Sequence, residues 1–156
     1  MIQIRPATQS DQKTIERIVR EANINPMSLD WRRFLVAEDD VPSTEFTLRN
    51  EGLRMIVGVG QVKPHDDGSR ELASIAVIPE HQRQGIASEI IRALLANERG
   101  DLYLICRDEL ESFYERFGFW RIGPKEMPPY FRTIIRVISI FARVVGRRGI
   151  VMKRNA

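Results

Sequence analysis

The sequence predicts an α+β fold in which a mixed, mostly antiparallel sheet is flanked by helices. Short apolar runs with the alternation of half-buried strands follow one another closely in the first half of the chain. In the second half such runs are separated by stretches with helical spacing, which is typical of helical crossovers over a sheet. The length of 156 residues suits one hydrophobic core, so we expect a single domain over residues 1–156.

The strands are predicted from apolar runs that stop at residues unsuited to a sheet. The first run ends at Pro6, which has no amide proton for a ladder hydrogen bond. A turn sequence at 64–68 separates two runs and predicts a hairpin between them. No element is predicted over 41–52, because this stretch is polar and aperiodic. The expected strands are residues 2–5, 34–37, 55–62, 71–78, 102–106, 119–122 and 149–153.

Three helices are predicted from apolar residues spaced three and four apart. Thr8 and Asp11 have the spacing of a capping box ahead of the first helix. The second helix lies between Pro79 and Gly100, with its apolar residues on one face. The third covers 110–117.

A fourth, amphipathic helix is predicted over residues 129–146, before the last strand. Its polar side chains fall within about 80° of one another around the helix, and nearly all others are apolar. So wide an apolar surface needs cover from its own domain and from a second surface. We expect a homodimer through residues 131–145, while contact with a membrane surface and burial within the chain are the alternatives. The polar residues are Arg132, Arg136, Ser139, Arg143 and Arg147.

The composition is that of a globular protein, with 43% hydrophobic and 29% charged residues. These values exclude a disordered chain. The one cysteine, Cys106, cannot form an internal disulfide, which fits a reducing compartment. The N-terminus is polar and no apolar run reaches the length of a membrane span, so we expect a cytoplasmic protein.

The charge is unevenly distributed along the chain. The formal net charge is +3, but the segment from Arg121 onward carries +8 and the first 120 residues carry −5. A solvated arginine face is the simplest interpretation. A surface for anionic lipid, nucleic acid or a phosphorylated ligand is the alternative. Nucleic-acid binding is not favoured, because no aromatic residue lies among the arginines on the polar face of the predicted helix.

The most informative stretch is residues 72–87, LASIAVIPEHQRQGIA. It predicts a buried strand, a short loop and then a helix with Gly85 and Ala87 in its first turn. The first four amides of a helix have no partner within it, and the helix dipole adds positive charge there. Arg83 and the amides of residues 84–87 therefore form a predicted diphosphate site. The stretch has neither the paired glycines of a Rossmann site nor the lysine of a P-loop.

Three segments of the chain resemble the GCN5-related N-acetyltransferase (GNAT) superfamily. Residues 82–87, QRQGIA, resemble its Q/R-x-x-G-x-G/A signature. Residues 4–8 with Asp11 resemble its opening strand and helix, and residues 113–119 resemble its Y-x-x-x-G-F block. The resemblance covers residues 2–122 and implies the GNAT fold, with the helix at 129–146 as an addition.

The resemblance also implies acetyl-CoA as co-substrate and transfer of its acetyl group directly to an amine. In the family, the backbone at the strand end holds the pantetheine and the loop amides hold the pyrophosphate. The matching residues here are Ile75, Ala76 and Val77 for the first and Gln82, Arg83, Gln84, Gly85, Ile86, Ala87 and Ser88 for the second.

Two residues are candidates for proton transfer. Tyr114 occupies the family's tyrosine position and is the candidate acid, while a core aromatic on the helix is the other interpretation. Glu71 lies eleven residues before Gln82, where some members carry a catalytic glutamate, and is the candidate base. The alternative is a solvated acid at the strand end, with an ordered water in the role of base.

The acetyl acceptor is not identified by the sequence. By analogy with the family, residues 27–31 and 127–130 form the walls of its site. His65 and His81 are expected on the surface and far apart, so no metal site is predicted. Cys106 is expected to be a buried small hydrophobe rather than a nucleophile. The rival functions are a non-catalytic acyl-CoA sensor and a membrane-surface or nucleic-acid-associated protein that uses the arginine stripe.

Overall fold

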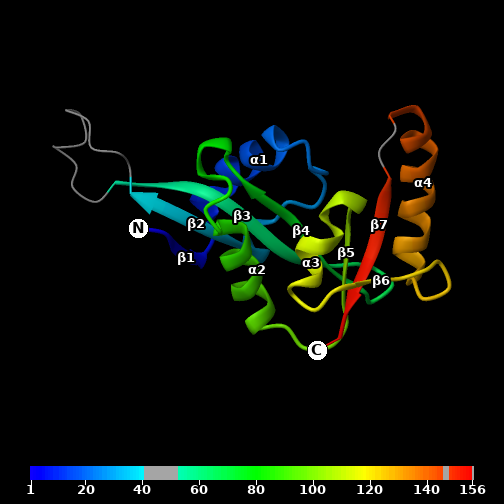
Figure 1. The fold of residues 1–156 in the computed structure, drawn as a ribbon. Coiled ribbons are helices and arrows are strands. Elements are labelled where there is room, and N and C mark those ends of the chain that lie inside the picture. Colours follow the sequence, from blue (N-terminus) through cyan, green and yellow to red (C-terminus); the bar gives the residue numbers. More distant parts are fainter. Residues whose placement is uncertain (41–52, 146–147, 156) are drawn as a thin grey trace. The chain divides into compact units, whose positions relative to one another are not determined.

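The strands of the computed structural model form one seven-stranded sheet in the order β1-β2-β3-β4-β5-β7-β6 (Figure 1). Helices flank this sheet, so the predicted α+β class is confirmed. The structure describes residues 1–40, 53–145 and 148–155, and for 141–145 it describes the backbone of a helix. The stretch 41–52, for which no element is predicted, lies outside the described residues.

The element bounds agree with the predicted ranges to within a few residues. The strands are β1 (Gln3–Pro6), β2 (Phe34–Asp40), β3 (Arg54–Pro64), β4 (Arg70–Val77), β5 (Leu102–Arg107), β6 (Trp120–Arg121) and β7 (Gly149–Arg154). The helices are α1 (Gln12–Glu21), α2 (Ile86–Ala96), α3 (Glu111–Glu115) and α4 (Pro129–Val145). Short 3-10 turns lie at Gln9–Asp11, Trp31–Arg33, Pro79–His81 and Asp108–Leu110.

The residues group into two compact units. The first unit comprises Met1–Gln61 and Ser74–Asn97, and the second comprises Val62–Ala73 and Glu98–Ala156. A single domain over residues 1–156 stays a prediction.

The predicted capping residues meet at the start of α1 in the first unit. Asp11 Oδ2 accepts hydrogen bonds from the backbone N–H of Thr8 at 2.7 Å and from the Thr8 hydroxyl at 2.9 Å. Arg5 Nη1 donates to the same oxygen at 2.8 Å, and this hydrogen bond lowers the pKa of Asp11. A 3-10 turn carries these residues, so the α-helix itself begins only at Gln12.

Strand β2 is three residues longer than predicted. After a bulge at Ala37, its acidic residues 38–40 continue the antiparallel pairing with β3. The carboxylate of Glu38 forms an ion pair with Arg5, and Asp40 Oδ1 lies 3.4 Å from Arg54 Nε. Because these cations lie next to them, the acidic residues 38–40 can form the last part of β2, although the apolar run ends at Ala37.

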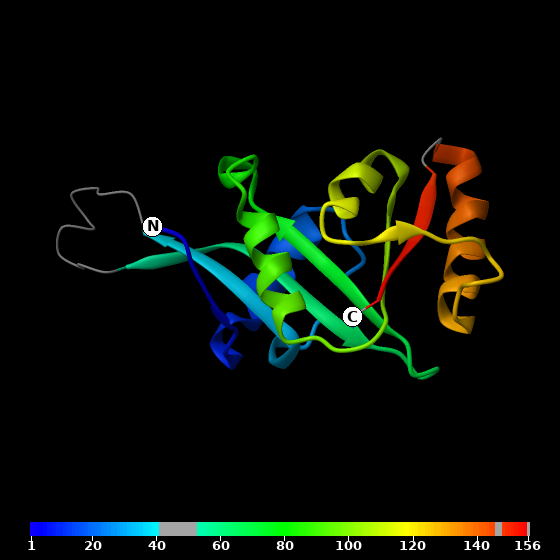
Figure 2. The same cartoon turned by 60° about the horizontal axis from the view of Figure 1, so that its bottom comes forward.

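Helices α1 and α2 cover opposite faces of the strands of the first unit (Figures 1 and 2). On the α1 face, Ile15 and Ile18 of the helix are buried in one cluster with Val59 of β3. The next residue of β3, Gly60, faces α2, where a Cβ atom would lie only 2.7 Å from Ile90 Cγ2 and 2.6 Å from Ile75 Cδ1. The missing side chain therefore lets α2 pack directly on the strand.

The second unit is built around β5. This strand pairs with β7 in antiparallel fashion, and β6 pairs with β7. β4 lies parallel to β5, with Glu71 opposite Tyr103. The predicted hairpin turn between β3 and β4 is closed by a hydrogen bond from His65 N–H to Ser69 O at 2.9 Å.

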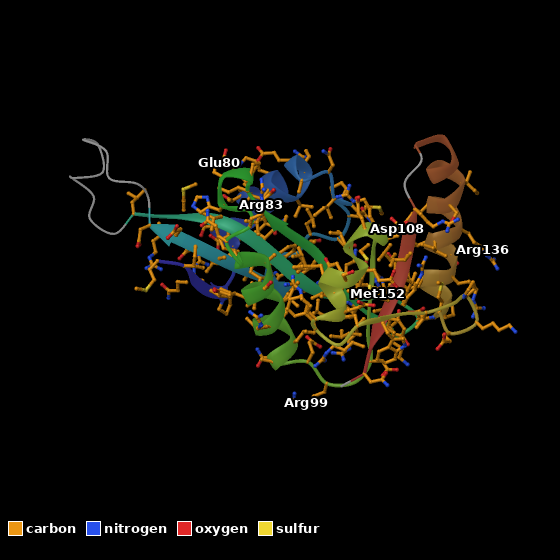
Figure 3. All side chains as sticks on the ribbon, viewed as in Figure 1. Glu80, Arg83, Arg99, Asp108, Arg136 and Met152 are labelled. Atoms are coloured by element: carbon orange, nitrogen blue, oxygen red, sulfur yellow. The ribbon has the colours of Figure 1, made fainter. Side chains whose placement is uncertain are left out.

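Helix α4 lies alongside β7 in both ribbon views (Figures 1 and 2). Phe131 near its start is fully buried in a cluster with Tyr103, Ile122, Met127 and Val151. Farther along, the side chains of Val137 and Ile140 stay 45% and 68% exposed, and Arg136 projects on the side away from β7 (Figure 3). The chain thus covers one side of the helix, as predicted. None of the helices within the described residues has the length and apolar character to span a bilayer.

Replacing Gly60 with alanine is expected to lower the free energy of unfolding by about 1–3 kcal/mol, because the added methyl group overpacks the contact with α2. Gly123→Ala is the matched control, since no atom would lie within 4 Å of its new Cβ. That control should change stability by less than about 0.5 kcal/mol. Urea denaturation measures both, and equal stability of the two variants would contradict the packing described for α2.

Candidate active site

A tight loop joins the end of β4 to the start of α2. Two of its residues have positive φ, Arg83 at 62° and Gly85 at 85°. Glycine adopts this left-handed conformation at little cost, which suits it to the position directly before the helix. The side-chain amide of Gln82 donates to Val77 O at 3.0 Å and ties the loop to the strand end. The two positive φ angles and this hydrogen bond therefore restrict the loop to one conformation.

The start of α2 presents free amides at an accessible surface. The first hydrogen bond of the helix runs from Glu89 N–H to Gly85 O at 3.1 Å, so helix geometry leaves the amides of residues 85–88 without a partner inside the helix. Ile86 is buried and anchors the turn, while residues 82–85 are exposed. Arg83 adds its side chain to the same loop (Figure 3). This is the geometry of an anion site.

Strand β4 contains a backbone irregularity just before residues 75–77. Ser74 has a φ of 57° in mid-strand, a conformation that costs energy for a residue with a side chain and that marks bulges and functional sites. Its Oγ accepts a hydrogen bond from Gln61 Nε2 at 3.0 Å, and both residues are buried. The sequence does not indicate this pair, because a polar residue within an apolar strand gives no periodic signal.

A cavity of about 690 Å³ lies beside the loop in the first unit. The imidazole of His81 lines it, with Nε2 3.4 Å from Asp39 Oδ2 and with Nδ1 buried and lacking a hydrogen-bond partner among the described residues. The cavity touches the loop at Val77 and Gln82, but much of its wall comes from α1. Its lining residues are Arg17, Ile18, Glu21, Ala22, Met55, Val77, Ile78, Pro79, Glu80, His81 and Gln82.

Tyr114 lies in α3 within an aromatic cluster of the second unit. Its ring contacts Phe113 and Phe119 edge-on, with centroids 5.0 Å and 6.3 Å away. Burial raises the pKa of the phenol far above its ordinary value, and the neighbouring Cys106 adds to the effect. The hydroxyl therefore remains protonated at neutral pH, as a hydrogen-bond or proton donor must.

Glu71 is buried, with 7% of its surface exposed. Its Oε2 lies 2.9 Å from His65 Nε2 and 3.4 Å from Lys63 Nζ. The alternative interpretation of Glu71 as a solvated acid is therefore wrong, because the β3–β4 hairpin encloses the carboxylate between two nitrogen groups.

The expectation of surface histidines is also wrong. The side chain of His65 is 9% exposed and that of His81 is 19% exposed. The ring of Tyr130 stacks on His65 at a centroid distance of 3.4 Å, and Phe131 contacts it edge-on at 5.6 Å. The local sequence could not show the burial of His65, because the aromatic rings that cover it come from α4, more than sixty residues later. The candidate base and the predicted wall at 127–130 thus meet in the second unit.

The remaining candidates are the second wall segment and the cysteine. The other predicted wall, 27–31, belongs to the first unit, and its Met27 is 69% exposed. Cys106 is buried as predicted, and burial raises the pKa of its thiol to about 11, which makes it an unreactive thiol. Among the described residues, no three or more His, Cys, Asp or Glu side chains form a group that could hold a metal ion.

The family model of the acetyltransferase (GNAT) domain matches residues 30–121. The chain belongs to the GNAT acetyltransferase family. The matched residues include the loop before α2, Glu71 and Tyr114, so the resemblance seen in the loop signature is confirmed. A search of the curated proteins returned no match.

Solved structures of GNAT proteins share the fold. N-acetylglutamate synthase from Neisseria gonorrhoeae, in complex with coenzyme A and N-acetyl-glutamate, has a TM-score of 0.68 at 20% identity over 99% of this chain and 35% of that one. Rv2747 from Mycobacterium tuberculosis, in complex with CoA and a second ligand, has a TM-score of 0.69 at 19% identity over 99% of both chains. A GNAT acetyltransferase from Bacillus cereus has a TM-score of 0.62 at 17% identity over 99% of this chain and 97% of that one.

The predicted GNAT fold is thereby confirmed for this chain. The chain spans only about a third of the length of the N-acetylglutamate synthase chains that it matches, whereas it spans nearly all of the Mycobacterium and Bacillus chains.

Proposed function

We propose that this GNAT protein transfers an acetyl group from acetyl-CoA directly to an amine. The observation that carries the proposal is the loop before α2, where residues 82–85 are exposed and the first amides of the helix follow the left-handed Gly85. Membership of the family and the coenzyme A in the Neisseria and Mycobacterium complexes support the same ligand. The chemistry of the site requires no metal.

The coenzyme is proposed to bind along β4 and the following loop. The backbone of Ile75, Ala76 and Val77 would hold the pantetheine arm, just after the irregularity at Ser74. The pyrophosphate would accept hydrogen bonds from the loop and the first turn of α2. The residues of that second group are Gln82, Arg83, Gln84, Gly85, Ile86, Ala87 and Ser88.

The reaction needs one base and one acid. The amine nitrogen attacks the thioester carbonyl, the new C–N bond forms, the C–S bond breaks, and the amine proton passes to Glu71. Tyr114 donates a proton to the departing sulfur and recovers one from solvent, and Glu71 releases to solvent the proton that it took from the amine. An α-amine, with a pKa near 8, gives up its proton more readily than a lysine side chain, with a pKa near 10.4.

A panel of acceptors tests the proposed function. Polyamines, amino acids, aminoglycosides and peptides are each incubated with acetyl-CoA, and thiol release and the acetylated product are measured. We expect transfer to at least one class. Tight CoA binding by calorimetry with no transfer to any amine would favour the acyl-CoA sensor. Binding to vesicles or nucleic acid that falls steeply with salt and survives loss of the loop would favour the arginine-stripe function.

Replacing Gly85 with aspartate is expected to weaken CoA binding by about tenfold or more, because a carboxylate would face the diphosphate. Gly85→Asn is the matched control, since asparagine has nearly the same shape, tolerates positive φ and brings no charge. Calorimetry measures both affinities. If the aspartate and asparagine variants bind CoA equally well, the diphosphate does not lie at the start of α2.

Tyr114→Phe is expected to lower kcat by about 100-fold or more while CoA affinity stays unchanged, because only the proton donor is removed. The raised pKa of Tyr114 keeps the phenol protonated up to and beyond about pH 10, so this residue should cause no loss of wild-type kcat below that pH. Steady-state kinetics and calorimetry measure these quantities. An unchanged kcat in the variant would remove Tyr114 from the mechanism.

We also propose a cytoplasmic homodimer formed through α4. The support is the exposure of Val137 and Ile140 on a helix whose other side is covered by its own chain. Ile140→Glu is expected to shift the sedimentation coefficient from dimer to monomer, whereas Ser139→Glu, one residue away on the polar face, should not. A monomeric wild-type protein would contradict the dimer.

A further inference from the structure

We propose that His65 and Tyr130 form a positioning device for Glu71. Together with Lys63, this device fixes Oε2 of the Glu71 carboxylate and leaves Oε1 to receive a proton. The inference rests on the proposed function, because it takes Glu71 as the base for the acetyl acceptor. It adds residues from the β3–β4 hairpin and from α4 to the acid Tyr114 and the base Glu71.

The contacts of the Glu71 carboxylate converge on one atom. Within the part of the chain that the structure describes, His65 Nε2 at 2.9 Å and Lys63 Nζ at 3.4 Å both approach Oε2. All three side chains are less than 10% exposed. A buried carboxylate held by two nitrogen groups has little freedom to change rotamer. Oε1 is therefore presented in a fixed direction to an amine or to an ordered water.

The start of α4 holds the imidazole in place. The Tyr130 ring lies 16° from parallel to the His65 ring at a centroid distance of 3.4 Å. The backbone N–H of Tyr130 donates to Asp67 Oδ2 at 2.9 Å, which fastens the helix start to the same turn that carries His65. Phe131 closes the edge of the imidazole. The turn and the helix thus restrict the ring from two sides.

Tyr130 lies outside the residues that the family model matches. The GNAT domain model matches residues 30–121 and therefore includes His65 and Glu71 but ends before α4. The stack thus joins an element of the shared fold to an element beyond the matched region. Positioning of this kind affects the rate, because displacement of a reacting group by about 1 Å can cost about 100-fold.

His65→Gln and His65→Asn form a matched pair that tests the device. The glutamine amide nitrogen can reach the Glu71 carboxylate from nearly the position of Nε2, while the shorter asparagine cannot. We expect kcat to stay within about threefold of wild type for His65→Gln and to fall by about 10- to 100-fold for His65→Asn, with CoA affinity unchanged in both. Equal kcat values for the two variants would overturn the proposal.

Tyr130 is tested in the same way. Tyr130→Leu removes the stacked ring and should lower kcat to the level of His65→Asn, whereas Tyr130→Phe keeps the ring and should lower kcat less. Thr133→Ala, on an exposed position of the same helix, is the control and should leave kcat unchanged. If Tyr130→Leu folds and turns over like wild type, the helix does not position the base.

A double variant separates positioning from packing. Glu71→Gln removes the base and should lower kcat by about 100-fold or more. If His65 acts through Glu71, adding His65→Asn to Glu71→Gln should cause no further loss. Multiplied losses in the double variant would overturn the proposal.

A measurement without turnover keeps this inference separate from the proposed function. Long-range ¹H–¹⁵N spectra of the wild-type protein report the proton on His65 Nε2. That signal should move in Glu71→Gln and in Tyr130→Leu but not in Thr133→Ala. Failure of every amine in the panel would refute acetyl transfer while these shifts still hold, whereas an imidazole signal indifferent to Glu71→Gln would refute the positioning device.

Discussion

The unsatisfied amides at the start of α2 are the constraint on which the site depends. They can serve a ligand only if the helix is held firmly while its first turn stays accessible. The structure meets both conditions, because Ile86 is buried while residues 82–85 are exposed. Gly60 allows the helix to lie close to the sheet, and Gly85 allows the chain to enter it through a left-handed turn. Gly60 and Gly85 thus determine how closely α2 packs on the sheet and how the chain enters the helix.

How much could be predicted from the sequence depended on how far apart the interacting residues lie. The loop at 82–87 was predictable, because its strand, proline, glycine and helix follow one another within sixteen residues. The extent of β2 was not, since its last residues rely on Arg5 and Arg54 from other strands. The burial of His65 was missed for the same reason, because Tyr130 covers it from another element. Local periodicity reports a segment's own preference and does not report such partners.

Helix α4 has different surroundings at its two ends. Near its start, Phe131 and Tyr130 pack into the second unit and cover polar groups of the hairpin. Farther along, Val137 and Ile140 are apolar and exposed. The sequence indicated the wide apolar surface, but it could not show which part of that surface packs against the chain and which part stays exposed. The division follows from β7, which lies alongside the helix and covers one side of it.

The hydrogen bond between Asp67 and the start of α4 has a consequence for how this protein could diversify. The residues proposed to bind the acetyl donor come from one short stretch of chain, so they can be inherited intact while the rest of the protein changes. The surroundings of Glu71 combine a hairpin turn with a helix encoded much later, and an exchange of that helix would alter them without touching the donor. Under the proposed role of Glu71, acceptor preference is therefore the property most open to evolutionary change and to engineering.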